Sequence, residues 1–325
     1  MLRALLVVLV LGLGVAAFAG YVLFQRFDAP GPAAADARIL IERGQSVAGV
    51  AAMLEGQGVL QEALPFRILA RLENKAAALK VGEYMAPAGA SPRQILTLLT
   101  EGPAIVRRFT VPEGATTAEA LKIVAAAEGL TGPLPEGVPE GALLPETYHY
   151  AWGDTRQAAV ARMAKAMEAA LAEALAVLPA DHPLKTAEEL ATLASIVEKE
   201  TALAAERPRV AAVFVNRLRR GMLLQSDPTT IYAVTRGQTK LSRPLTYADL
   251  RRDDPYNTYV APGLPPGPIA SPGRASLMAA ANPPETDEFY FVADGTGGHA
   301  FARTLNEHNR NVRAWRRIER ERGLR

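Results

Sequence analysis

The hydrophobic pattern of the chain begins with one unbroken run and becomes periodic only afterwards. Residues 4–24 carry no charged side chain, and Arg26 closes the run. At about 1.5 Å per residue, a helix of this length crosses a hydrocarbon core of roughly 30 Å. The pattern predicts a transmembrane anchor over residues 1–27, with the short positive end in the cytoplasm and the remainder outside it.

A cleaved signal peptide is the alternative for the same segment. Ala17-Phe18-Ala19 resembles a cleavage site of the A-x-A type behind an apolar core. The apolar run nevertheless continues through Phe24, beyond that site, which favours an anchor that is not cleaved.

A short linker and a small module follow the first run. Residues 28–36 are rich in Pro, Ala and Gly, which is typical of a linker. An apolar strand pattern at 39–41 precedes two helical patterns, the second at 62–79, and Gly82 begins another extended piece. This strand, helix, helix, strand order over residues 37–104 resembles a LysM-type module, a class that holds glycans containing N-acetylglucosamine. A packing or spacer domain is the alternative.

Helical periodicity dominates the rest of the chain, and short strand patterns lie at its flanks. A strand is expected from Val106, a turn at 112–114 and a helix from Ala118 with Thr116 or Thr117 as its cap. Residues 129–142 are expected to form an irregular loop. Further helices are predicted at 157–177, 186–200, 208–220 and 310–325. The sequence therefore predicts an α+β domain over residues 105–325.

The helix predicted at 186–200 ends in two carboxylates. Thr186 and Glu189 form a capping-box pattern at its start, and an apolar stripe then runs into Glu198-Lys199-Glu200. At about 100° per residue, Glu198 and Glu200 lie at opposite edges of that stripe. Helix geometry indicates that one of them is the functional carboxyl without saying which, and two solvated helix-end residues are the alternative.

A carboxyl on an otherwise apolar helix suits acid catalysis. Loss of solvent disfavours the charged form, so the group keeps its proton near neutral pH. Glycoside cleavage needs such a proton donor. The pattern therefore favours an enzyme that acts on glycans.

Two later segments carry candidate sugar-binding residues. Gln225 and Asp227 lie in a loop, and Tyr256, Asn257 and Tyr259 precede GLPPGPIASPG at 263–273. Prolines and glycines at this density leave the loop little conformational freedom to lose on binding. Aromatic rings stack on sugar faces while amides bond hydroxyls, so these residues are expected to line a groove leading to the catalytic carboxyl. A proline-rich loop without a ligand is the alternative.

Composition excludes several other classes of function. The chain has no cysteine, which rules out disulfides and thiolate metal sites, and its four histidines show no metal-binding spacing. The net charge of +2 over 325 residues does not favour a nucleic-acid partner. No metal and no cofactor are therefore expected.

Four long motifs, in order, resemble the MltG/YceG-like endolytic murein transglycosylases. They are LASIVEKET at 193–201, VFVNRLRRGMLLQSDPT at 213–229, YNTYVAPGLPPGPIASPG at 256–273 and FYFVADGTGGHAFARTLNEHN at 289–309. The similarity covers roughly residues 105–315, and the family shares the anchor and the LysM-like unit. The resemblance implies that Glu198, the first glutamate of its motif, is the catalytic residue.

The resemblance also implies the reaction and its place in the cell. It implies cleavage of the β-1,4 bond between N-acetylmuramic acid and N-acetylglucosamine in peptidoglycan, with a 1,6-anhydro end. One carboxyl acts as acid and then as base. The expected location is the inner membrane, single-pass, with the catalytic domain in the periplasm, and peptidoglycan synthases are candidate partners. A hydrolysing muramidase with Asp227 as second carboxylate and a non-catalytic glycan-binding scaffold remain alternatives.

Overall fold

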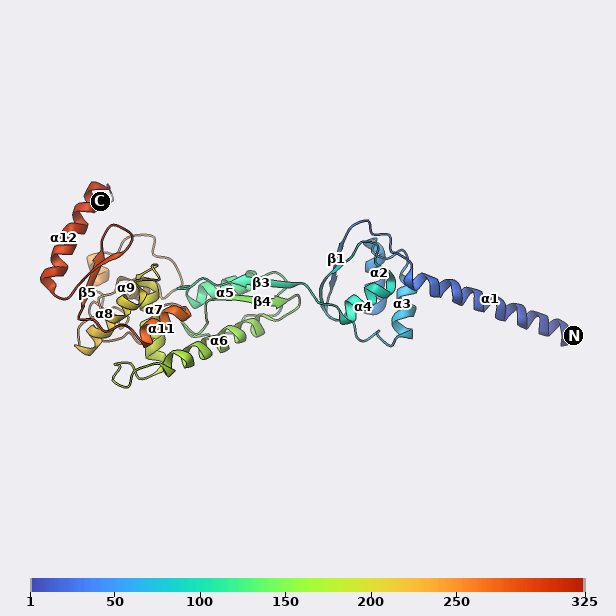
Figure 1. Cartoon of the computed structure of the whole chain (residues 1–325), viewed down its shortest axis with the longest axis horizontal. Helices are drawn as coiled ribbons and strands as arrows, with labels where there is room; N and C mark the ends of the chain where they lie inside the picture. Colours follow the sequence, from blue (N-terminus) through green and yellow to red (C-terminus); the bar gives the residue numbers. More distant parts are fainter. Residues whose placement is uncertain (1, 324–325) are drawn as a thin grey trace. The chain divides into compact units, whose positions relative to one another are not determined.

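The computed structural model describes the backbone of residues 2–323 and the side chains from residue 6 onward except residue 7. These residues divide into two compact units (Figure 1). The smaller unit extends to Arg107 and includes 128–131 and 149–154, and the larger contains 108–127, 132–148 and the chain from Thr155 onward. The mixture of helices and short strands confirms the predicted α+β class.

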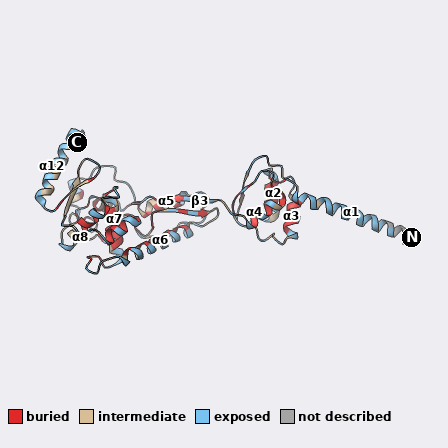
Figure 2. Ribbon diagram, viewed as in Figure 1, coloured by how far each residue is buried: buried red, intermediate tan, exposed pale blue. Residues whose placement is uncertain are grey.

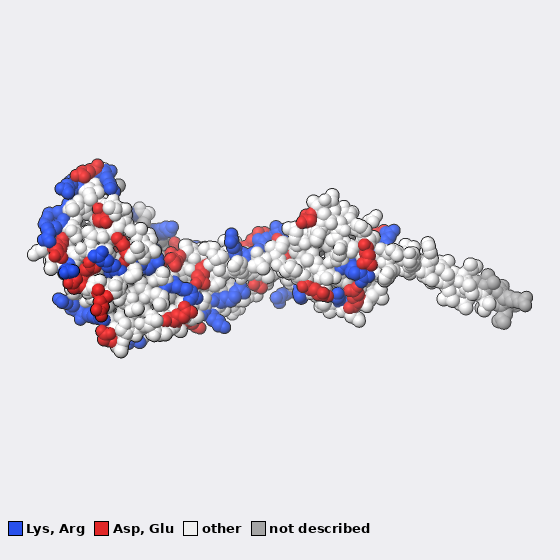
Figure 3. Space-filling model, in the orientation of Figure 1, with Lys and Arg blue, Asp and Glu red and all other residues white. Residues whose placement is uncertain are grey.

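The first helix, α1 (Leu2–Asp28), coincides with the uncharged run. Within the described chain, its segment Val8–Asp28 is the one that is long and apolar enough to cross a membrane. Figure 3 shows most of its surface without charged side chains, whereas acidic and basic groups alternate elsewhere on the same face.

The smaller unit has the predicted strand, helix, helix, strand order, followed by one more helix. Strand β1 pairs antiparallel with β2, so that Ile39 lies opposite Tyr84 and both are buried. Apolar faces of the helices, among them Leu54, Phe66 and Leu96, complete its core. The elements are β1 (Ala37–Ile41), α2 (Val47–Gly56), α3 (Ala63–Leu72), β2 (Gly82–Ala86) and α4 (Pro92–Glu101).

Helix α3 is shorter than the sequence pattern predicts. It ends at Leu72 rather than near residue 79, and Asn74 behind it has a left-handed backbone with φ 53°. Asparagine tolerates this conformation better than most residues and so often ends a helix. The predicted helix of 62–79 was therefore too long.

The elements predicted from β3 onward are present, and the structure adds β4 and α9 to α11; Asp227, predicted in a loop, begins α9. The capping box predicted at Thr186 is complete, and Thr116, one of the two predicted caps of α5, also forms one. Strand β3 pairs with β4 in a second small sheet. The elements are β3 (Val106–Thr110), α5 (Thr117–Ala126), β4 (Thr147–Ala151), α6 (Arg156–Ala176), α7 (Ala187–Glu200), α8 (Arg207–Arg219), α9 (Asp227–Thr235), α10 (Tyr247–Leu250) and α11 (Arg274–Ala281).

Helix α7 is the centre of the larger unit. Every residue from Leu190 to Val197 is buried, and Figure 2 shows the helix mostly in red. It packs against α6, α8 and α11, with Phe214 and Leu277 in the shared core. Because α7 is held on several sides, its last turn is a rigid platform for whatever side chains it carries.

A hairpin and one helix complete the larger unit. Strands β5 (Tyr290–Ala293) and β6 (His299–Ala302) pair antiparallel, with Ala293 opposite His299. Helix α12 (Leu305–Glu321) begins five residues before the predicted helix at 310 and contains no fully buried residue. Its cap is Thr304, whose hydroxyl accepts from the Glu307 amide at 3.2 Å.

Candidate active site

The last turn of α7 sends its two carboxylates into different surroundings. Glu198 has a side chain that is only 5% exposed, and its Oε2 accepts the amide of Gly273 at 2.9 Å. Its other oxygen lies 3.4 Å from the Arg207 guanidinium. Gly273 is the N-cap of α11, so the Glu198 carboxylate compensates the positive end of that helix.

A second carboxylate belongs to the surroundings of Glu198. Glu113 lies 3.6 Å from Arg207, and burial followed by the charge of Glu198 raises the pKa of Glu113. A Cβ added to Gly273 would come within 2.0 Å of a Glu113 oxygen, so any larger residue there would push the Glu113 side chain aside. The group Glu113, Arg207, Glu198 and Gly273 thus joins the start of α11 to α7.

Glu200 lies on the wall of a cavity. The cavity has a volume of about 440 Å³. The Ser226 hydroxyl donates to Glu200 Oε1 at 2.5 Å. Burial, helped by the nearby charge of Asp227, raises the pKa of Glu200 to about 7 against the opposing effects of Ser226, His299 and Arg217. Glu200 is therefore a carboxyl that holds a substantial protonated fraction at neutral pH.

We call this space the Glu200 cavity. Its wall combines acceptors, donors and aromatic rings, as a sugar site requires. The residues that line it are Glu200, Arg217, Leu224, Gln225, Asp227, Tyr259, Phe291, Val292, Ala293, His299, His308 and Val312.

Three of the five predicted sugar-binding residues lie on this wall. Tyr259 donates its hydroxyl to Asp227 Oδ1 at 2.6 Å, and Asp227 begins α9. Gln225 has a left-handed backbone with φ 51°, which is uncommon for a residue with a side chain. The backbone amide of Gln225 donates to the Thr258 carbonyl at 3.1 Å, which holds the turn in place. Strain of this kind is often kept where a loop serves a site.

The other two predicted residues lie elsewhere. Tyr256 lines a separate cavity of about 620 Å³ together with Gly141, Met167 and Pro268. Asn257 is fully buried, and its amide group donates to the carbonyl oxygens of Asp249, Leu250 and Arg252. The Asn257 side chain therefore organises the loop from inside.

Within residues 2–323, no group of three or more His, Asp or Glu side chains is placed to hold a metal ion.

Comparison with known proteins assigns the chain to a family. The family described as YceG-like matches residues 39–314, which is most of the chain and includes the whole Glu200 cavity. The chain belongs to the YceG-like family. The resemblance drawn from the four motifs is thereby confirmed.

Relatives of this YceG-like chain include proteins of two bacteria. A protein of Bacillus subtilis named endolytic murein transglycosylase is 45% identical over 122 residues, which are 38% of this chain and 33% of that protein. A protein of the same name from Streptococcus pneumoniae is 30% identical over 320 residues, which are 84% of this chain and 57% of that protein. The chain thus spans about a third to somewhat over half of the length of these relatives.

A solved structure has the same fold. The crystal structure of a YceG-like protein from Listeria monocytogenes superposes with a TM-score of 0.54 at 29% sequence identity. The match covers 85% of this chain and 98% of that one.

Sequence reasoning missed several residues of the Glu200 cavity. Phe291 and His299 lie inside the fourth family motif, and His308 is near its end, but their types alone gave no reason to join them to Glu200. Arg217 looked like one of several arginines at the end of α8. Only the return of the β5–β6 hairpin and α12 to the end of α7 brings these side chains together.

Proposed function

We propose that this chain is an endolytic peptidoglycan lytic transglycosylase. It would cleave the β-1,4 bond between N-acetylmuramic acid and N-acetylglucosamine and leave a 1,6-anhydro end. The observation that carries the proposal is a carboxyl of pKa about 7 on the wall of a polar and aromatic cavity. The names of the relatives support the same reaction class.

The proposed reaction needs one carboxyl and no water. The protonated carboxyl gives its proton to the glycosidic oxygen as that bond to the anomeric carbon breaks. The 6-hydroxyl of the muramic sugar then forms a bond to the same carbon and returns its proton to the carboxylate. An internal nucleophile is already close to the reacting carbon, so no second carboxylate has to activate water.

We assign the proton transfer to Glu200 rather than to Glu198. The raised pKa of Glu200, its position on the cavity wall and its neighbours Gln225, Asp227 and Tyr259 support this assignment. Glu198 accepts the Gly273 amide and contacts Arg207, and it is not among the residues that line the Glu200 cavity. Glu198 stays the candidate that the motif resemblance implies, and the two can be separated by substitution.

Hydrolysis by the same site is the second candidate function. Asp227 lies in the same cavity as Glu200 and would be the second carboxylate that a hydrolysing muramidase needs to activate water. We infer the transglycosylase because the Asp227 carboxylate already accepts the Tyr259 hydroxyl.

Product analysis tests this proposal. The purified protein is incubated with peptidoglycan strands, and the fragments are examined by mass spectrometry. We expect internal cuts with 1,6-anhydro-muramic ends, which weigh one water less than reducing ends. Reducing ends would instead identify a hydrolase, and intact strands would leave a glycan-binding scaffold.

We further propose a role for each segment of the chain. Residues 1–27 would anchor it in the inner membrane, 28–36 would be a linker, 37–104 a LysM-like glycan-binding module and 105–325 the catalytic domain in the periplasm. The apolar helix and the strand, helix, helix, strand order support the first and third roles. Peptidoglycan would be the main partner, and synthases of the same polymer are candidate protein partners.

Membrane fractionation tests the role of residues 1–27, and a glycan-binding assay tests the role of residues 37–104. We expect the full chain to sediment with membranes and a variant lacking residues 1–27 to be released from them. A variant lacking residues 37–104 should bind isolated glycan more weakly. Membrane-free recovery of the full chain, or unchanged glycan binding without the module, would contradict the respective role.

A further inference from the structure

The ring of His299 is held in one orientation by Glu206. The Glu206 carboxylate lies 2.7 Å from His299 Nδ1 and also accepts the His299 backbone amide at 2.9 Å. A carboxylate can only accept, so Nδ1 carries the proton and Nε2 is left with its lone pair. In the part of the chain that the structure describes, Nε2 has no hydrogen-bond partner, and it is not sealed from solvent.

Small and aromatic residues surround the pair of His299 and Glu206. Gly298 precedes the histidine, and a Cβ at Gly298 would lie 2.6 Å from a Glu206 oxygen. The imidazole packs edge-on against Phe291 and lies near Phe301, at ring centroid distances of 5.3 and 6.3 Å. Glu206 makes no capping hydrogen bond with its own helix α8, so its carboxylate is committed to His299.

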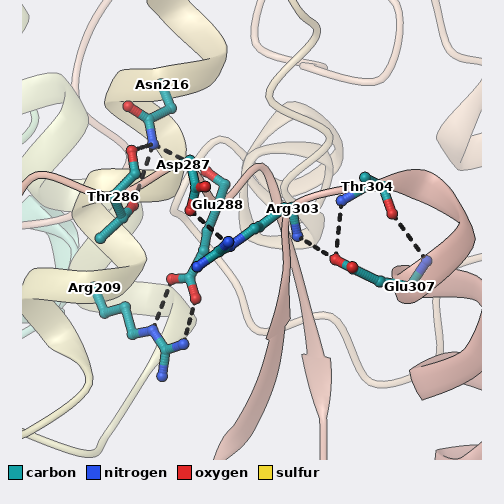
Figure 4. A network of polar contacts seen from close by, with 8 residues as sticks. All are labelled: Arg209, Asn216, Thr286, Asp287, Glu288, Arg303, Thr304 and Glu307. Carbon is teal, nitrogen blue, oxygen red and sulfur yellow. Dashed lines mark hydrogen bonds and ion pairs between the residues drawn. The ribbon is translucent and has the colours of Figure 1, made fainter.

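The hairpin that carries His299 is fixed to α8. Figure 4 shows Arg209 paired with Glu288 and the Asn216 amide reaching Thr286, at the chain entering β5. At the same open end of the hairpin, Arg303 after β6 pairs with Asp287 before β5 at 2.8 Å. These contacts give β5 and β6 a defined position beside α8.

His299 and Glu200 share one cavity. Both line the Glu200 cavity, and His299 is close enough to affect the ionisation of Glu200 electrostatically. A protonatable ring with a free nitrogen and an oriented tautomer thus lies beside the carboxyl to which we assign proton donation.

We propose that His299 is a second catalytic residue, positioned by Glu206, which accepts the proton of the attacking hydroxyl while Glu200 donates to the leaving oxygen. The inference rests on the function proposed above. It divides between two groups the steps that a single carboxyl would otherwise perform in turn.

The proton balance closes within the cavity. Glu200 loses its proton to the glycosidic oxygen as the bond to the anomeric carbon breaks. His299 Nε2 takes the proton from the 6-hydroxyl as that oxygen bonds to the same carbon. One proton transfer from the imidazolium to the Glu200 carboxylate then restores the starting state, and no other reactant is needed.

The pH profile of the reaction should report Glu200. Proton donation needs the protonated carboxyl, so the rate falls as pH rises through about 7. Glu206, the N-cap of α8, contacts the imidazole directly. The other titratable or charged groups that share the cavity wall with His299 are Glu200 of α7, Arg217 of α8, Asp227 of α9, Tyr259 of the loop after α10 and His308 of α12.

His299→Ala in the full chain tests the proposal directly. We expect formation of anhydro ends to fall about 100-fold, while the fall in rate above about pH 7 that belongs to Glu200 is kept. Imidazole added to the solution should restore the rate at least several-fold, because the lost ring leaves room on the cavity wall. Glu200→Gln is the matched control, and imidazole should not restore it.

Glu206→Gln provides a second variant if His299→Ala does not fold. Loss of the carboxylate charge weakens the contact that orients the ring and fixes its tautomer, so the formation of anhydro ends should fall, although less than in His299→Ala. A His299→Ala enzyme with more than a third of the wild-type rate would overturn the inference. Absence of anhydro ends from the wild-type protein would instead overturn the proposed function and the inference together.

Discussion

Glu200→Gln is expected to lower the formation of anhydro ends by roughly 10³-fold, because glutamine fills the same space but cannot donate a proton to the leaving oxygen. Initial rates on peptidoglycan strands, measured by mass spectrometry of the fragments, provide the readout. The protein should fold normally, since the Ser226 hydroxyl can still donate to the amide oxygen at position 200.

Glu198→Gln is the matched control for this prediction. Its amide oxygen can still accept from Gly273, so we expect activity within about five-fold of wild type. The weaker contact with Arg207 and α11 should cost about 1 kcal/mol of unfolding free energy. An active Glu200 variant beside an inactive Glu198 variant would support the assignment from the motif resemblance. Activity in both would place the chemistry elsewhere.

Glu200→Gln should also change how stability depends on pH. The pKa of Glu200 is raised from an ordinary value of 4.5 to about 7 in the folded chain. This carboxyl therefore adds stability that is fully present below pH 4.5 and is lost as pH rises through 7. At about 1.4 kcal/mol per tenfold change, the loss above pH 8 is about 3 kcal/mol. The glutamine variant should lack this loss, which denaturation at pH 5 and pH 8 would reveal.

Arg217→Ala is expected to destabilise the chain by about 3 kcal/mol and to reduce activity with it. Arg217 is 7% exposed, and its guanidinium donates to the carbonyl oxygens of Phe289 and Leu224, both at 2.7 Å. Removing it leaves these buried acceptors without partners and releases the segments that carry Gln225 and β5. The unfolding free energy from urea denaturation provides the measurement.

Arg219 offers a control on the same helix. Its guanidinium lies 3.3 Å from Asp181, but the two side chains are 43% and 80% exposed. A solvated pair contributes little, so Arg219→Ala should change stability by less than about 1 kcal/mol. Equal changes in unfolding free energy for the two substitutions would mean that the buried hydrogen bonds of Arg217 do not stabilise the fold.

The elements that the sequence predicted well are those governed by local rules. The capping box of Thr186 and the apolar face of α7 are both periodic and local, and they located the two carboxylates correctly. Helix α3 was predicted too long because Ala- and Leu-rich residues continue the helical pattern beyond Asn74, where the backbone turns left-handed.

The site was predictable only in part, for a geometric reason. Gln225, Asp227 and Tyr259 were expected near a catalytic carboxyl, and they share a cavity with Glu200. Periodicity put Glu198 and Glu200 on opposite edges of one helix, but it could not say which of the two side chains lines a cavity. That depends on where α11 and the β5–β6 hairpin return, which is decided by contacts about 75 to 100 residues away in sequence.

Helix α12 closes part of the Glu200 cavity, so the shape of that cavity depends on the chain that follows α11. His308 and Val312 of α12 form part of the cavity wall, although α12 has no buried residue of its own. Loss of the chain after α11 would remove Phe291, His299, His308 and Val312 from the cavity wall and leave α7 in place. Under the proposed function, we expect such a shortened protein to form no anhydro ends although it still contains Glu200, Gln225, Asp227 and Tyr259.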